Sequence, residues 1–127
     1  NVFLTSIIQD ALKTKKIILQ SKLDSEKDYV YIDDALNMML KISLQGKNSI
    51  YNIASGQNIK NNEIVNKLKE ITGCKIEVMK NATIHLFPPI SIKQIQKEFN
   101  FEPTSILNKF EKIVSEYEEK LNMNKND

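Results

Sequence analysis

The sequence predicts a small α/β domain, and two observations predict it. Segments in which apolar residues recur at helical spacing alternate with short segments rich in β-branched and aromatic residues, as is typical of α/β proteins. The chain has 127 residues, of which 41% are hydrophobic and 27% are charged. This length and this composition suit one globular domain that buries a core.

The first half of the chain is predicted to run helix, strand, strand, helix. Residues 17–19 are a predicted strand, residues 20–27 a polar loop and Tyr29–Ile32 a second strand. Asp34 is the expected N-cap of the next helix, because its carboxylate can accept from an unpaired backbone N–H; Gly46 ends that helix. The inward positions of the two helices are Phe3, Leu4, Ile7, Ile8, Ala11 and Leu12, then Ala35, Met38, Met39 and Ile42.

The second half continues the alternation. Residues 49–54 are a predicted strand, and Ser55–Gly56 a turn. A helix is expected over residues 61–72, with Gly73 in the left-handed conformation that ends helices. The remaining predictions are an exposed strand over 75–79, a loop over 80–90, a short helix with Ile92, Ile95 and Phe99, and, after Pro103, a helix from Thr104 or Ser105 to about Leu121 with a frayed tail at 122–127.

Composition excludes several classes of function. The net charge of +2 is too weak to indicate a nucleic acid or an anionic membrane as partner. A single cysteine, Cys74, excludes an internal disulfide, and a single histidine, His85, excludes any site that needs two. With only Gly46, Gly56 and Gly73, the chain has no glycine-rich loop that could cradle a phosphate.

The ends and the hydropathy of the chain carry two further expectations. No apolar run approaches the roughly 20 residues of a membrane span, and no signal peptide is visible, so we expect a cytoplasmic protein. The chain begins at Asn1 without a methionine, and helical spacing starts almost at once. This indicates truncation, with a processed terminus or a tag remnant as the alternatives.

Side-chain chemistry alone points to no catalytic or metal site. His85 lies in a predicted loop and is expected to be structural or exposed, because no nucleophile stands near it in a known motif. Cys74 follows a helix-ending glycine and is expected to pack as a small apolar residue. On these grounds the sequence describes an α/β domain and little more.

Three segments in a fixed order add a resemblance. They are KDYVYIDDA at 27–35, SIYNIASG at 49–56 and FNFEPTSI at 99–106. In this order and spacing they resemble the C-terminal half of the extended short-chain dehydrogenases/reductases, the NAD(P)-dependent sugar-nucleotide epimerases and dehydratases. The resemblance covers nearly the whole chain, and it implies a small mixed α/β substrate-binding lobe over residues 1–121.

The resemblance also implies what is missing. In that family an N-terminal Rossmann domain supplies the glycine-rich loop and a Tyr-x-x-x-Lys pair. Neither is present here, since none of the four tyrosines has a lysine four positions later. The chain is therefore expected to have no cofactor site and no catalytic residue of its own, while the full-length enzyme would use NAD or NADP. The missing Rossmann domain and a nucleoside-diphosphate sugar are the implied partners.

The resemblance implies four substrate-binding residues, Ile18, Leu19, Lys27 and Asn52. Ile18 and Leu19 would line the nucleotide site. Lys27 stands where the family has an arginine that reaches the diphosphate, and a lysine supplies the charge without the bidentate fork. Asn52 matches the asparagine of the family's Y-N-[IL]-G segment. The family's glycines are replaced by Ser21, Leu23 and Ala54, which weakens the match at the nucleotide loop.

A second hypothesis comes from a different class. In the family the strand that matches Ile50–Ile53 extends the sheet of the Rossmann domain, so without that domain its edge would be bare. The chain could then be a free-standing, non-enzymatic α/β interaction module that acts by sheet-edge pairing, including a homo-oligomer formed through that edge. A G-x-x-G-x-x-G segment and a Y-x-x-x-K encoded upstream of Asn1 would favour the enzyme, and a start codon there would favour the module.

Overall fold

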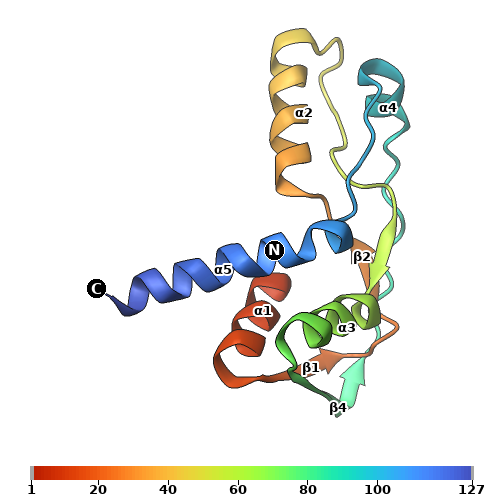
Figure 1. The fold of residues 1–127 in the computed structure, drawn as a ribbon. Helices are drawn as coiled ribbons and strands as arrows, with labels where there is room; N and C mark the ends of the chain where they lie inside the picture. The colour runs from red at the N-terminus through yellow and green to blue at the C-terminus, as the bar shows by residue number, and fades with distance from the viewer. Residues whose placement is uncertain (1, 127) are drawn as a thin grey trace. The chain divides into compact units, whose positions relative to one another are not determined.

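A computed structural model describes residues 2–126 and divides them into two compact units (Figure 1). The first unit comprises residues 2–25, 60–85 and 107–126, and the second comprises residues 26–59 and 86–106. The helices and strands are α1 (Val2–Thr14), β1 (Lys16–Ser21), β2 (Glu26–Asp28), α2 (Ile32–Gln45), β3 (Asn58–Lys60), α3 (Asn61–Thr72), β4 (Lys75–Thr83), α4 (Lys93–Phe99), the 3₁₀ turn η1 (Ile106–Lys109) and α5 (Phe110–Lys125). The predicted small mixed α/β fold is confirmed.

The first unit is built on a parallel pair of strands. β1 pairs with β4 in a register that places Ile17 opposite Ile76 and Leu19 opposite Val78. Parallel strands need a long crossover; the connection from β1 to β4 passes through β2, α2 and β3 and ends with α3. Gly73 ends α3 in the left-handed conformation, with φ of 70°, as predicted. α1 packs against β1, α3 and α5, so helices bury the apolar residues of this unit.

Burial in the first unit follows the predicted helical faces. Ile7, Ile8 and Ala11 of α1 are buried, and so are Ile64, Val65 and Leu68 of α3. Phe110 and Val114 are buried on α5. That helix continues to Lys125, past the predicted end at Leu121 and into the predicted tail, whose last residue, 127, lies outside the described residues.

The second unit has a smaller core between α2 and α4. Met38 of α2 and Ile95 of α4 are buried with Ala54, Ile92 and Phe101. The sheet of this unit is short, because β2 and β3 each have three residues. Lys60, at the end of β3, belongs to the first unit.

Two predicted strands are wrong, and both lie in the second unit. Tyr29–Ile32 is not a strand, because the strand is Glu26–Asp28 and Ile32 already begins α2. Residues 49–54 belong to no strand in the part of the chain that the structure describes. β-branched and aromatic residues favour a strand only where a neighbouring strand is available to pair with it, and in the described residues none pairs with 49–54. No helix among residues 2–126 is both long enough and apolar enough to cross a membrane.

Candidate functional site

The predicted phosphate-binding lysine lies in the middle of β2. Lys27 is half-buried, and its Nζ lies 5.2 Å from the centroid of the Tyr29 ring. Burial lowers the pKa of Lys27 below its usual value, because it removes water from around the ammonium group. A cation over an aromatic face is attracted by the ring quadrupole. Lys27 is thus a positioned cation, unlike a lysine that extends freely into solvent.

Tyr29 forms the other half of this pair and is unusual in its own right. Its side chain is buried, and its hydroxyl has no hydrogen-bond partner among the described residues. Burial raises the pKa of Tyr29, because desolvation penalises the phenolate. The hydroxyl therefore keeps its proton at neutral pH. Sequence inspection could not find this feature, since an unpartnered buried hydroxyl leaves no pattern in the chain.

The loop that carries Asn52 is fixed to β2 by Asp28. The carboxylate of Asp28 accepts hydrogen bonds from the backbone N–H groups of Ser55 at 2.8 Å and Gly56 at 2.7 Å. Asn52 is exposed, and its side-chain amide donates to the carbonyl of Ser91 over 3.5 Å. Lys27 and Asn52 therefore belong to one unit in which a neighbouring carboxylate holds the loop to the strand.

Asp34 has a different role from the one predicted. The N-cap position of α2 is occupied by Tyr31, which makes no side-chain capping bond. The Asp34 carboxylate instead accepts from the backbone N–H of Thr104 at 2.6 Å and from its hydroxyl at 3.3 Å. The predicted cap is wrong, because Asp34 lies inside the first turn of α2 and binds a segment distant in sequence. Asp34 thus makes a structural contact, as predicted, with a different partner.

The two other predicted site residues belong to the first unit. Ile18 and Leu19 are neighbours in β1, so their side chains point to opposite faces. Ile18 is half-exposed, whereas Leu19 is buried at 1% exposure and packs in the core. The structure thus divides the four predicted residues, with Ile18 and Leu19 in one unit and Lys27 and Asn52 in the other. Their contact with a substrate stays a prediction.

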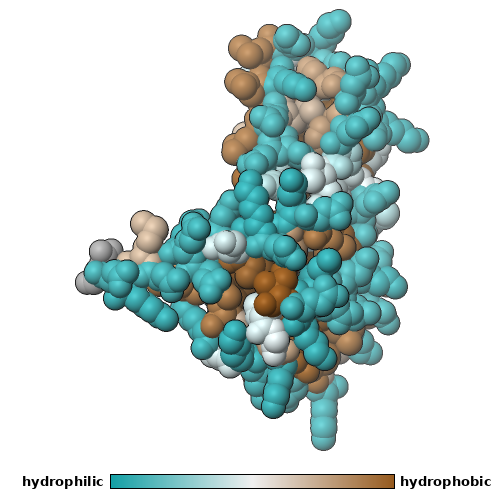
Figure 2. All heavy atoms as spheres, viewed as in Figure 1, coloured by the Kyte–Doolittle hydropathy of each residue, from teal (hydrophilic) through white to brown (hydrophobic). Residues whose placement is uncertain are grey.

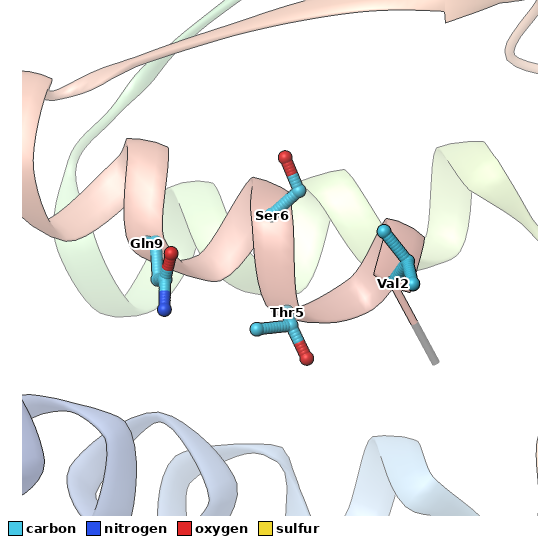
Figure 3. Close-up of a pocket in the computed structure, with 4 residues that line it drawn as sticks. All are labelled: Val2, Thr5, Ser6 and Gln9. Atoms are coloured by element: carbon cyan, nitrogen blue, oxygen red, sulfur yellow. The ribbon is translucent and has the colours of Figure 1, made fainter.

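The groove along α1 is a poor candidate for a ligand site. It is lined by Val2, Thr5, Ser6 and Gln9, all on α1 (Figure 3). Thr5 and Gln9 point to the side where α5 lies, and the Thr5 hydroxyl is hydrogen-bonded to the Tyr117 hydroxyl at 2.8 Å. None of these four lining residues is charged, so they offer no cation to pair with a phosphate.

His85 and Cys74 do not form a site either. Cys74 is buried and its thiol is free, as expected for packing. The His85 Nε2 lies 3.0 Å from the Thr83 hydroxyl, and its backbone N–H donates to the Ser25 hydroxyl. Within residues 2–126 no group of three or more His, Cys, Asp or Glu side chains is arranged to hold a metal ion.

The glycines do not fit a dinucleotide either. A dinucleotide-binding turn places closely spaced glycines just before a helix N-terminus, beside the pyrophosphate. Gly46 and Gly73 instead follow the C-terminal ends of α2 and α3. A Cβ at Gly56 would lie 2.9 Å from Cγ1 of Ile92, so this glycine makes room for a core side chain. None of the three glycines therefore lies in a glycine-rich turn of the kind that binds a dinucleotide.

Solved structures share this fold, although no family model and no curated protein sequence matches the chain. One is dTDP-glucose 4,6-dehydratase from Bacillus anthracis in complex with NAD, with a TM-score of 0.78, 21% identity, and coverage of 91% of this chain and 39% of that chain. A second is ADP-L-glycero-D-manno-heptose-6-epimerase from Helicobacter pylori, with a TM-score of 0.74, 24% identity, and coverage of 94% and 37%. A third is RMD from Pseudomonas aeruginosa complexed with NADPH, with a TM-score of 0.74, 19% identity, and coverage of 92% and 42%.

These matches define the fold of the chain. The chain has the fold of part of the dehydratase, of the epimerase and of RMD, and the first two are enzymes of the kind that the three sequence segments resemble. The chain spans between 37% and 42% of the length of these three proteins.

Proposed function

We propose that residues 1–121 are the C-terminal, substrate-binding portion of an NAD(P)-dependent sugar-nucleotide epimerase or dehydratase. One observation carries the proposal: nearly the whole chain shares its fold with part of two enzymes named for their nucleotide sugars, yet spans only 37–39% of their length. The chain would bind a nucleoside-diphosphate sugar and would not be catalytic alone. NAD or NADP would be bound by the rest of the enzyme, and we expect the enzyme in the cytoplasm.

Lys27 is the residue that we expect to contact the diphosphate. Lys27 is half-buried and its ammonium lies over the Tyr29 ring, so less side-chain freedom remains to be lost when a phosphate binds. A phosphate oxygen would accept a charge-assisted hydrogen bond from this ammonium. Asn52, Ile18 and Leu19 complete the proposed set, by resemblance to the family.

The test is a calorimetric titration of the complete polypeptide in which this chain occurs. UDP-, GDP-, CDP- and dTDP-sugars are titrated in turn, and we expect one of them to bind. Lys27→Met should weaken that binding about tenfold or more, because a charge-assisted hydrogen bond is lost. Lys97→Met is the matched control, since Lys97 is exposed on α4 and carries the same charge. Failure of every nucleotide sugar to bind would falsify the proposal.

The alternative, a non-enzymatic module that pairs through a sheet edge, has a weaker basis. Its predicted strand, residues 49–54, lies in neither sheet of the described chain, although Ile50 there is 78% exposed. Light scattering on the 127-residue chain separates the two. Self-association that depends on concentration and is abolished by Ile50→Lys would support the module, and a clean monomer at high concentration would remove it.

A further inference from the structure

The segment over residues 49–56 lies in neither sheet of the described chain, so side chains must fix its position. Tyr51 and Ile53 are partly buried and pack on the core of the second unit. Asn52, between them, is exposed. Packing on either side of Asn52 thus fixes how deep the segment lies, while the Asn52 side chain stays outside the core.

Apolar packing gives this segment little directional hold. The hydrophobic effect is non-directional, and part of the apolar surface of the second unit lies outside its core. Figure 2 shows apolar side chains gathered along one edge of α2, where Leu40 and Leu44 are 59% and 74% exposed. Hydrogen bonds depend on both distance and direction. They are therefore the contacts that can hold the segment in one place.

Asp28 makes two such bonds at one end of the segment. The two oxygens of its carboxylate accept from consecutive backbone N–H groups, Oδ1 from Ser55 at 2.8 Å and Oδ2 from Gly56 at 2.7 Å. Consecutive N–H groups that converge in this way form a concavity suited to an anion. Gly56 has a φ of 79°, which glycine adopts without steric cost. Here the anion is Asp28 itself, so the segment is bound to β2 at two points.

Glu98 binds the other end of the segment. Its carboxylate accepts from the Tyr51 hydroxyl, with 2.9 Å between the hydroxyl and Oε1, and from the backbone N–H of Lys47 at 3.1 Å. Asn52 follows Tyr51 directly, so it lies between the bonds of Glu98 and those of Asp28. Two acids thus hold the segment on both sides of a proposed substrate residue.

Asp28 also belongs to the strand that carries Lys27. The two residues are consecutive in β2, so their side chains point to opposite sides of the strand. The ammonium of Lys27 lies over the Tyr29 ring, and the Asp28 carboxylate is bonded to the segment. A carboxylate next in sequence to a diphosphate contact opposes the binding of an anion by charge alone. A benefit of Asp28 for binding must therefore come from the segment that it holds.

We propose that Asp28 is a positioning residue for the nucleotide sugar, and that it acts through Asn52. The inference rests on the proposed function, which assigns Lys27 and Asn52 to the binding of that ligand. Asp28 fixes the segment of Asn52 to the strand of Lys27, so both groups are in place before the ligand arrives. Binding groups that are held in advance lose less freedom when the ligand binds, which raises the affinity.

A double-mutant cycle on the complete polypeptide tests the proposal. The nucleotide sugar that binds the native protein is titrated by calorimetry into Asp28→Asn, Asn52→Ala and the double variant. Asp28→Asn should weaken binding about tenfold, because a displaced binding group loses its contact. When Asn52→Ala is already present, the same substitution should weaken binding by less than about threefold, because the contact that Asp28 positions is gone.

Asp34→Asn is the matched control. Asp34 also accepts from a backbone N–H group of the second unit, that of Thr104 at 2.6 Å. The segment that it binds carries none of the four proposed substrate residues. Urea unfolding of the 127-residue chain should show similar losses of stability for Asp28→Asn and Asp34→Asn, whereas only Asp28→Asn should weaken nucleotide-sugar binding. A merely structural role for Asp28 would make the two variants alike in both measurements.

Each result decides the question. Equal losses of affinity for Asp28→Asn with and without Asn52→Ala overturn the proposal, and so does an equal loss for Asp34→Asn. Unchanged or tighter binding, which removal of a negative charge alone would give, also overturns it. Asp28→Glu keeps an acceptor but displaces it by one methylene, and the same cycle with this variant decides if Asp28→Asn does not fold.

The native polypeptide separates this inference from the proposed function. Binding of a nucleotide sugar without coupling between Asp28 and Asn52 removes only the positioning role. Failure of the native polypeptide to bind any nucleotide sugar removes the proposed function, and the positioning role with it.

Discussion

Different interactions stabilise the interior of each of the two units. The first unit relies on a regular parallel ladder between β1 and β4 and on helices that bury Ile8, Leu68 and Phe110 almost completely. The second unit has strands of three residues each, a smaller core, and an exposed apolar face on α2.

In the second unit three carboxylates accept hydrogen bonds from backbone N–H groups of loops. Asp28 accepts from the backbone of Ser55 and Gly56, and Asp34 from the backbone of Thr104. The third carboxylate, Glu98, accepts from the backbone N–H of Lys47 and from the hydroxyl of Tyr51. Each satisfies a backbone donor that lies outside the helices and strands of the described chain. A short sheet can thus be replaced by acidic side chains that bind loops at fixed points.

The largest loss of stability is expected from a substitution in the core of the first unit. Leu68→Ala should lower the free energy of unfolding by about 2–5 kcal/mol, because it leaves a cavity at a side chain that is 0% exposed. Leu44→Ala, at a side chain that is 74% exposed, should change it by less than about 0.5 kcal/mol in the 127-residue chain. Urea unfolding followed by circular dichroism measures both. Equal losses would contradict the contrast between a closed and an open apolar face.

The left-handed glycines offer a comparison between the units. Gly56 in the second unit and Gly73 in the first have φ of 79° and 70°. Gly73→Ala should cost about 1–2 kcal/mol from backbone strain alone, since nothing lies within 4 Å of the added Cβ. Gly56→Ala should cost about 1–3 kcal/mol more, because its Cβ would also meet Ile92. The same urea experiment ranks them, and a larger loss for Gly73→Ala would count against the packing assigned to Gly56.

Removing a carboxylate of the second unit should cost less stability, and only where that carboxylate binds a backbone N–H group. Asp34→Ala should cost about 1.5–3 kcal/mol, because the backbone N–H of Thr104 loses a charged acceptor. Asp33→Ala is the matched control, since both acids lie in the first turn of α2 and share the favourable helix dipole. Asp33 is exposed, so its loss should cost less than about 1 kcal/mol. If the two variants unfold at the same urea concentration, the Asp34–Thr104 bond does not stabilise the unit.

The same contrast explains which parts of the fold were predictable. The helix over residues 61–72 with its end at Gly73, and the strand at Ile17–Leu19, follow from periodicity and turn chemistry, which are local in sequence. The strand expected at 49–54 depends on a partner strand, which local pattern cannot supply. The bond of Asp34 to Thr104 spans 70 positions, so the local pattern indicates only a cap. Of the candidate site, Lys27 could be found by resemblance, whereas the unpartnered Tyr29 hydroxyl could not.

The smallest change in the free energy of unfolding is expected on removal of the Tyr29 hydroxyl. Tyr29→Phe should leave the free energy of unfolding at pH 8 unchanged or raise it by up to about 1 kcal/mol, because it removes a buried polar atom that has no partner. Tyr117→Phe, in the first unit, is the control and should cost about 0.5–1.5 kcal/mol, because Thr5 loses its partner. The phenyl ring in the Tyr29→Phe variant would still lie under Lys27, so the cation–π contact is kept.

At alkaline pH the difference in stability between Tyr29→Phe and the native chain should grow. The pKa of Tyr29 is raised in the folded chain, so its contribution to stability is fully present below the unfolded pKa of about 10 and is lost as the pH rises above it. At pH 11 the ionised tyrosine favours the unfolded state by about 1.4 kcal/mol, a penalty that Tyr29→Phe removes. The variant should therefore gain stability relative to the native chain between pH 8 and pH 11, as measured by urea midpoints. A constant difference across that range would mean that the Tyr29 hydroxyl ionises as readily in the folded chain as in the unfolded one.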